Sequence, residues 1–179
     1  MATRARIGLK QKNGTIIAAY QHWDGYPGGL GYNLCEHWTD PKKVLEAIKL
    51  GGASKWGQII GKKIDFDDRE NPLYEVQNVY YGRDRGEAGQ GPSVYKDEET
   101  YIEDGFNSGE EYIYLMKQED EKDFLGRSQG TWYYVGSTYT KEGKEVKDPF
   151  FKPVEEVAIQ EHIESLQRYL KDKKERKAA

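Results

Sequence analysis

Cysteine is nearly absent from this 179-residue chain, in which Cys35 is the only one. A single thiol forms no internal disulfide, so the fold must be stable without one, and a free cysteine is typical of a reducing compartment. The sequence has no apolar run approaching the roughly 18 residues that cross a bilayer, and no signal-peptide segment follows its charged first residues. These absences predict a soluble, cytoplasmic protein with no membrane association.

A positive net charge is also missing. The 27 lysines and arginines are outnumbered by 31 aspartates and glutamates, which gives a formal net charge of -4. This balance argues against direct DNA binding through the surface as a whole. The three histidines lie far apart, and the sequence contains no HExxH, GxSxG or Walker A motif and no GxGxxG that opens a helix after a strand. We therefore predict no bound metal and no cofactor.

Large aromatic side chains are abundant in a chain that is otherwise polar. Its mean hydropathy of -0.93 would suit a disordered polymer. However, 14 tyrosines, five phenylalanines and four tryptophans provide the apolar surface that a core needs. We predict a single α+β domain over residues 1–152, followed by an amphipathic helix and charged tail over 153–179 that packs on it or on a second copy.

The first part of the chain is predicted to form a β-hairpin followed by helices. An Asn-Gly pair at 13–14 separates two alternating apolar segments, so 6–23 should form two antiparallel strands. The glycines and the proline that follow predict a tight loop and, from Leu30, a short helix. A second helix is expected over 41–50, because Asp40 is a good N-cap residue and proline follows it.

The remainder is predicted to contain further strands and a closing helix. Strand-like composition recurs at 74–81, and the alternating segment 111–116 should pair with 131–135 as a second hairpin. The segment 54–71, which runs into the polar stretch 65–72, is expected to be an irregular connection. Apolar residues at helical spacing predict a helix over 153–173. The fold class that follows is α+β, with a largely antiparallel sheet, two helices after the first hairpin and a C-terminal helix.

Unusual chemistry is concentrated where the second predicted strand ends, in an aromatic loop (residues 22–26) that contains His22, Trp23, Asp24 and Tyr26. In a binding site, Trp23 and Tyr26 would stack on a base or sugar ring, while His22 and Asp24 would supply hydrogen bonds or proton transfer. In the structural alternative, Trp23 anchors the hairpin to the helices and Asp24 caps a turn. The sequence leaves both interpretations open.

An arginine cluster (residues 83–87) follows the strand predicted at 74–81. Arg83 and Arg85 are separated by one residue and can form forks for a phosphate or carboxylate, and Glu87 follows them. In the structural alternative, Asp84 and Glu87 neutralise the arginines in surface ion pairs that contribute little.

Several of these segments occur in a fixed order over residues 5–135. They are the hairpin turn at 13–14, HWDGYP at 22–27, the helix between 40 and 51, YGRDRGE at 81–87 and the late aromatic strands. In this order and spacing they resemble a family of small, uncharacterised phage and prophage proteins. Relatives often have cysteine where this chain has Gln21, which argues against thiol chemistry there. The resemblance implies a phage accessory protein in the cytoplasm of the bacterial host, and it brings no established activity.

The leading hypothesis is a non-enzymatic phage accessory protein that binds a host or defence component. The most specific form is a nucleotide-like ligand sequestered between the aromatic loop and the arginine cluster, with no catalytic residue. Because both clusters follow strands of one sheet, this hypothesis predicts that they are neighbours.

Two alternatives belong to other classes of function. In the first, the acidic stretch 97–123 mimics nucleic acid and inhibits a basic host protein. In the second, the protein is an enzyme that acts on a nucleotide or glycosidic bond through His22, Asp24 and Glu87. Self-association through the C-terminal helix is compatible with each of these hypotheses.

Overall fold

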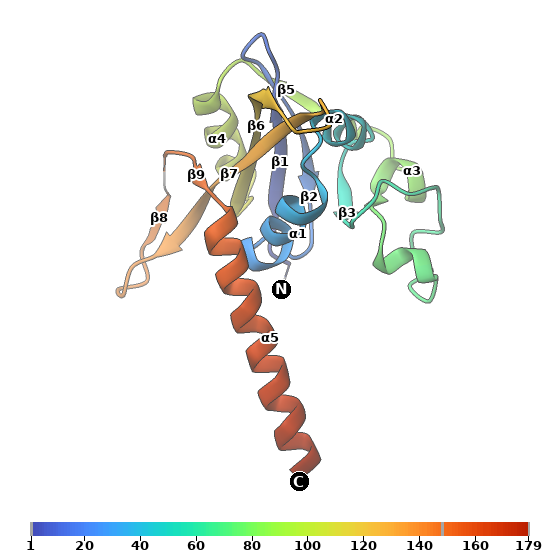
Figure 1. The fold of residues 1–179 in the computed structure, drawn as a ribbon, viewed down its shortest axis with the longest axis vertical. Coiled ribbons are helices and arrows are strands. Elements are labelled where there is room, and N and C mark those ends of the chain that lie inside the picture. Colours follow the sequence, from blue (N-terminus) through green and yellow to red (C-terminus); the bar gives the residue numbers. More distant parts are fainter. Residues whose placement is uncertain (1, 148, 179) are drawn as a thin grey trace.

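The protein has an α+β fold built on a largely antiparallel sheet, as a computed structural model that describes residues 2–147 and 149–178 shows (Figure 1). The predicted fold class is therefore confirmed. The strand order is β4-β3-β2-β1-β6-β7-β8, with β5 also paired to β2 and β9 to β7. The strands are β1 Ala5–Lys10, β2 Ile16–Gln21, β3 Ala53–Lys55, β4 Val79–Tyr80, β5 Ser93–Tyr95, β6 Tyr112–Lys122, β7 Ser128–Tyr139, β8 Glu145–Lys147 and β9 Lys152–Pro153.

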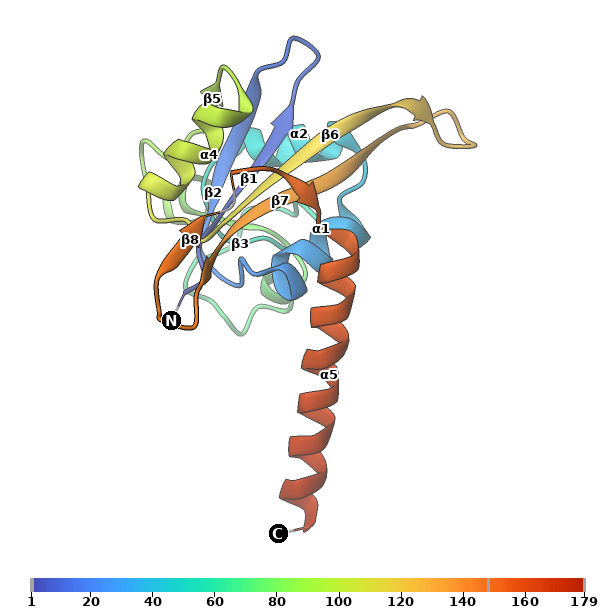
Figure 2. The same cartoon turned by 90° about the vertical axis from the view of Figure 1, so that its left-hand side faces the viewer.

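Two antiparallel hairpins, joined side by side, form the centre of this sheet. In the first, Ile7 of β1 lies opposite Ala19 of β2, and in the second, Tyr114 of β6 lies opposite Tyr134 of β7. Parallel pairing of β1 with β6 joins them. Both predicted hairpins are confirmed. The second extends further than predicted, because β6 and β7 stay paired through the charged segment and form a long arm (Figure 2).

The helices occupy both faces of the sheet. They are η1 Pro27–Gly31, a single π-helical turn, then α1 Tyr32–His37, α2 Pro41–Lys49, the 3-10 helix η2 Pro72–Glu75, α3 Tyr81–Arg85, α4 Glu98–Asn107 and α5 Glu155–Ala178. The helix predicted at 41–50 is confirmed as α2, and the carboxylate of Asp40 accepts a hydrogen bond from the Lys42 amide at 2.9 Å. None of these helices is both long and apolar enough to span a membrane.

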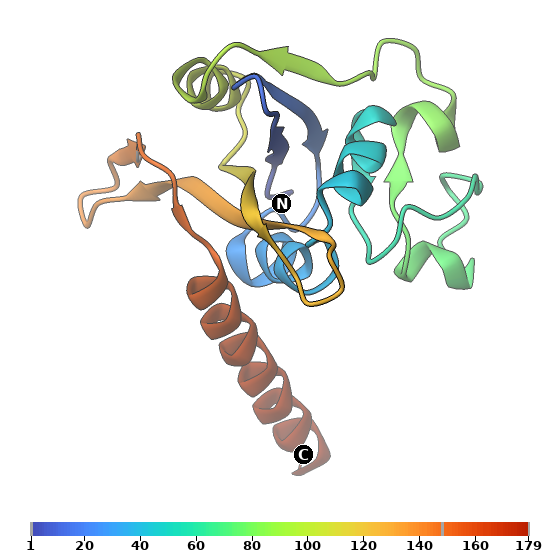
Figure 3. The same ribbon diagram turned by 45° about the horizontal axis from the view of Figure 1, so that its top comes forward.

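Side chains of β6 alternate between two cores. Tyr114 and Met116 belong to the larger core, which is shared with α1 and α2, whereas Ile113 and Leu115 pack with Tyr101 of α4 in the other. This alternation is what the period of a β-strand dictates. The sheet therefore lies between α4 on one side and α1 and α2 on the other (Figure 3).

Two segments differ from the prediction. The strand expected over 74–81 is wrong for most of its length, because the chain forms η2 there, then the two-residue strand β4, and then α3. The helix α4 was not predicted, because its acidic residues hid its apolar spacing. Asp97 caps this helix by accepting from the Thr100 amide at 2.8 Å, and Tyr101, Ile102 and Phe106 are buried on one side.

Candidate ligand-binding pocket

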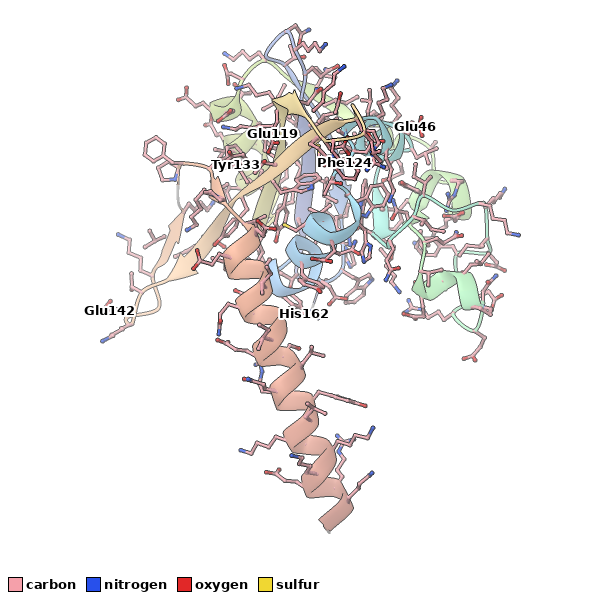
Figure 4. The ribbon with its side chains drawn as sticks, in the orientation of Figure 1. Glu46, Glu119, Phe124, Tyr133, Glu142 and His162 are labelled. Atoms are coloured by element: carbon pink, nitrogen blue, oxygen red, sulfur yellow. The ribbon has the colours of Figure 1, made fainter. Side chains whose placement is uncertain are left out.

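A cavity of about 320 Å³ lies beside the aromatic loop, between η1, the start of α1, the end of β3 and the first turns of α5. His162 of α5 lies where this helix leaves the body of the protein (Figure 4). The cavity is therefore built from three stretches that are distant in sequence, namely 21–33, 55–56 and 162–165. Its lining residues are Gln21, Trp23, Asp24, Tyr26, Gly28, Gly29, Leu30, Tyr32, Asn33, Lys55, Trp56, His162 and Ser165.

The aromatic loop turns sharply at Asp24. Its φ of 57° is the one positive value at a non-glycine residue in the described part of the chain, and aspartate is among the few residues that tolerate it. The Asp24 carbonyl accepts a hydrogen bond from the Leu30 amide at 2.8 Å. A side chain at Gly28 would place its Cβ 2.6 Å from the Cβ of Glu161. Glycine at this position therefore lets α5 approach the loop and close the cavity.

His22 and Trp23 differ in their relation to the cavity, although their rings contact edge to face with 4.8 Å between the centroids. Gln21 and Trp23 both line the cavity, whereas the imidazole Nδ1 of His22 lies 2.7 Å from the hydroxyl oxygen of Tyr20. Successive residues of an extended strand point to opposite faces, so the structure places His22 outside the cavity lining. Partial burial, together with the positive charge of Arg4, lowers the pKa of His22 below its ordinary value. The lowered pKa favours the neutral imidazole.

Aromatic rings form the walls of the cavity. Trp23 and Tyr26 are each 39% exposed, which is unusual for such large side chains and differs from the anchoring role that the structural alternative gives to Trp23. Tyr32 stacks on His162 with 3.9 Å between ring centroids and 3° between the ring planes. The cavity thus has two exposed rings that are available to a flat ligand.

Two residues that line this cavity each have a buried polar atom with no hydrogen-bond partner in the described part of the chain. These atoms are Oε1 of Gln21, an acceptor, and Nε1 of Trp56, a donor. The two side chains are only 2% and 5% exposed, and both line the cavity. The amide nitrogen of Gln21 donates to the Trp23 carbonyl at 2.7 Å, which fixes the orientation of the amide. An unpaired buried polar group costs roughly 1–3 kcal/mol, so both atoms need an explanation.

Arg83 has a structural role at a different place. Its guanidinium forms two hydrogen bonds to the buried carboxylate of Asp84, at 2.8 and 2.9 Å. It also donates to the Ile60 and Asn78 carbonyls and lies over the ring of Tyr80. These contacts hold the segment around residue 60 against β4. Arg83 therefore has its donors engaged within the protein.

Arg85 and Glu87 lie apart from the cavity lining as well. Arg85 is half exposed and pairs with Glu87 at 3.2 Å, which matches the surface ion pair of the structural alternative. The two arginines do not form one fork, because residues two apart on the helix α3 point in different directions.

The sheet topology explains why the two clusters separate. β2 is parallel to β3, with Gln21 beside Ala53, but β3 is antiparallel to β4, with Ala53 opposite Tyr80. Gln21, Ala53 and Tyr80 are thus neighbours across three adjacent strands, but β2 and β4 run in opposite directions. The chain therefore continues from Gln21 toward one end of the sheet and from Tyr80 toward the other. Accordingly, the His22 amide donates to the Ala53 carbonyl, and the Tyr81 amide donates to the Gly52 carbonyl. The structure does not bring the arginine cluster into the cavity lining.

The most informative residues of the cavity were not predicted. Trp56 lies in a stretch expected to be an irregular connection, and His162 lies in a helix predicted from its apolar spacing alone. Over residues 2–147 and 149–178, no group of three or more His, Cys, Asp or Glu side chains could hold a metal ion. Comparison of the chain with protein-family models, curated proteins and solved structures gave no match, so the resemblance to phage proteins stays a prediction.

Proposed function

We propose that the pocket binds a small molecule with a flat, polar ring, such as a nucleobase or nucleoside. The observation that carries this proposal is the unpaired acceptor of Gln21 together with the unpaired donor of Trp56, on two residues that line one aromatic-walled cavity. A ring that presents one donor and one acceptor would satisfy both atoms once the two side chains turn them toward the cavity. The free-energy cost of leaving these two atoms unpaired in the free protein is then explained by the hydrogen bonds that they form with the ligand.

The size and the walls of the cavity fit such a ligand. Ligand sites typically measure about 300–1,000 Å³ and combine apolar walls with a few polar groups. At about 320 Å³, this cavity is at the lower end, which favours a base or nucleoside over a longer molecule. Stacking of a base on an aromatic ring contributes roughly 1–3 kcal/mol, and Trp23 and Tyr26 are the exposed rings.

A phosphate group is not required by this pocket. Its lysine, Lys55, already forms an ion pair with Glu75 at 2.8 Å, and the arginine cluster is not part of the lining. The proposal therefore keeps the sequestering role of a phage accessory protein in a bacterial cytoplasm but assigns the uncharged part of a nucleotide-like ligand to the site.

The two alternatives have weaker support. Part of the negative charge of the stretch 97–123 is paired internally: Asp104 and Glu110 bind Arg6, and Glu98 binds Lys10 and Lys117. An enzyme would need His22, Asp24 and Glu87 together. Instead, His22 binds Tyr20, Asp24 lines the cavity and Glu87 binds Arg85.

Calorimetric titration with a panel of nucleobases and nucleosides tests the proposal, with ribose and inorganic phosphate as ring-free probes. Trp23→Ala should weaken binding of the best ring compound by about 5- to 150-fold, which corresponds to the roughly 1–3 kcal/mol of one stacking contact. Phe124→Ala is the matched control, since Phe124 is 93% exposed and lies at the turn of the β6–β7 arm (Figure 4). Equal affinity in a folded Trp23→Ala variant would contradict the proposal.

A second variant tests the polar atoms separately. Gln21→Met removes the unpaired acceptor and a hydrogen bond to Trp23, so the free energy of unfolding should change by no more than about 1 kcal/mol. Binding of the ring compound should nevertheless weaken by about tenfold, because the hydrogen-bond donor of the ligand loses its acceptor on Gln21. Unchanged binding in this variant would show that Gln21 is a structural residue only.

A further inference from the structure

Only the beginning of α5 packs on the rest of the protein. Val154 and Ala158 are fully buried, and the carboxylate of Glu161 accepts a hydrogen bond from the Gly28 amide at 2.7 Å. From residue 163 to residue 177 every side chain is exposed. Figures 1 and 2 show this part of the helix extending away from the body in both views. A projecting helix of this length is marginally stable in water unless another surface packs on it.

The projecting helix carries an apolar stripe on one side. Ile159, Ile163, Leu166 and Leu170 follow one another at spacings of four, three and four residues, which is the repeat of a coiled-coil seam. They are 39%, 43%, 50% and 54% exposed. At 100° per residue, this stripe points about 130° away from the side that holds Val154 and Ala158 against the body. The body therefore leaves the stripe uncovered along its whole length.

The charges of α5 are segregated along its axis. Residues 155–164 carry four glutamates and no lysine or arginine, whereas residues 165–177 carry six lysines or arginines and two acidic residues. The seam itself repeats this pattern. Continuing the same repeat places Glu156 before its first apolar residue and Lys173 after its last. The helix is thus complementary in charge to itself when two copies run in opposite directions.

We infer that α5 is a self-association surface on which the helix of a second copy of this chain packs antiparallel. When the midpoints of the two antiparallel stripes are aligned, Ile159 lies against the partner subunit's Leu170 and Ile163 lies against the partner subunit's Leu166. The same register places Glu156 beside the partner subunit's Lys173 at both ends of the seam. The contact spans 18 residues, or about 26 Å of helix.

The parallel arrangement is disfavoured by the same residues. It would place Glu156 against the partner subunit's Glu156 and Lys173 against the partner subunit's Lys173, and like charges at facing positions are destabilising. It would also bring the two acidic halves together, and likewise the two basic halves. The antiparallel arrangement instead places the two bodies at opposite ends of the seam.

Reversing the charges at the two ends of the seam tests this inference in the full-length protein. Sedimentation equilibrium should show a reversible dimer for the wild type. Lys173→Glu and Glu156→Lys, taken singly, should each raise the dimer dissociation constant by about tenfold or more, since each converts two attractive contacts into two repulsive ones. The double variant should restore much of the affinity. Only an antiparallel seam pairs these two positions, so the rescue reports on direction as well as contact.

Lys171→Glu is the matched control, because it makes the same change of charge two residues away on another side of the helix. Its dimer dissociation constant should stay near the wild-type value. The inference would be overturned by a wild-type protein that stays monomeric, by a double variant no better than the single ones, or by an equal effect of Lys171→Glu. Binding of α5 to anionic vesicles by a monomeric wild type would assign the stripe to a membrane surface instead.

Discussion

The aromatic loop and the arginine cluster look equally promising in the sequence, but they differ in how their polar groups are paired. In the arginine cluster, Asp84 is buried and accepts hydrogen bonds from Arg83 and from the Ile64 and Tyr80 amides. Beside the aromatic loop, by contrast, two buried polar atoms have no partner and two large rings are exposed. The pairing of polar groups, more than the residue types, distinguishes a structural motif from a binding one.

The largest expected effect tests the structural side of this comparison. Asp84→Ala would leave the guanidinium of Arg83, whose side chain is 15% exposed, without its ion pair and would leave two amides without an acceptor. Breaking a buried ion pair costs about 3–5 kcal/mol, so urea unfolding should show a loss of that order. Glu87→Ala, in the same cluster, should cost no more than about 1 kcal/mol. If Asp84→Ala and Glu87→Ala lost similar free energies of unfolding, the buried ion pair of Asp84 would not differ in importance from the surface ion pair of Glu87.

A smaller effect on stability is expected in the aromatic loop. Trp132 is 3% exposed, and truncating such a buried ring to alanine typically costs about 3–5 kcal/mol. Trp23→Ala should cost at most about 2 kcal/mol in the same urea assay, because part of its ring already contacts water. If Trp23→Ala destabilises the protein as much as Trp132→Ala, then Trp23 is an anchor as the structural alternative holds.

Fluorescence quenching tests the exposure of Trp23 in a second way. Trp38, Trp56 and Trp132 are buried, so the emission that acrylamide quenches most readily should come from Trp23. Trp23→Ala should abolish that component in the folded protein. A ring compound bound in the pocket should protect it in the wild type, and a quenchable component that survives Trp23→Ala would argue that another tryptophan is accessible.

The smallest effect is a dependence of stability on pH. The pKa of His22 is lower in the folded protein than in the unfolded chain, mainly because of burial. The unfolded chain therefore binds more protons, so stability is complete above the ordinary histidine pKa of about 6.5 and decreases as the pH falls below it. His22→Gln should reduce the slope of stability against pH in that range. Measuring the unfolding midpoint at several pH values in both proteins would detect the difference. Identical slopes would show that His22 does not contribute to the pH dependence of stability.

The parts of the fold that local signals define were predictable. The Asn-Gly turn at 13–14 and the Asp40 cap each specify their element through neighbouring residues, and both elements are present. The segment 74–81 was misread because Val79 and the adjacent tyrosines have strand composition, while tertiary contacts decide its conformation. The candidate site was predicted in part. Trp23, Asp24 and Tyr26 line the cavity, but no local pattern indicates that Trp56 and His162 would join them.

The hydrogen bond between Gly28 and Glu161 joins residues that are 133 positions apart. During synthesis, the loop on one side of the pocket therefore emerges long before the helix that completes the other side. Such distant contacts form late, because the intervening chain must first fold and bring its ends together. The pocket is thus completed only after His162 and Ser165 have left the ribosome, and a nascent chain has a sheet before it has a place to hold a ligand.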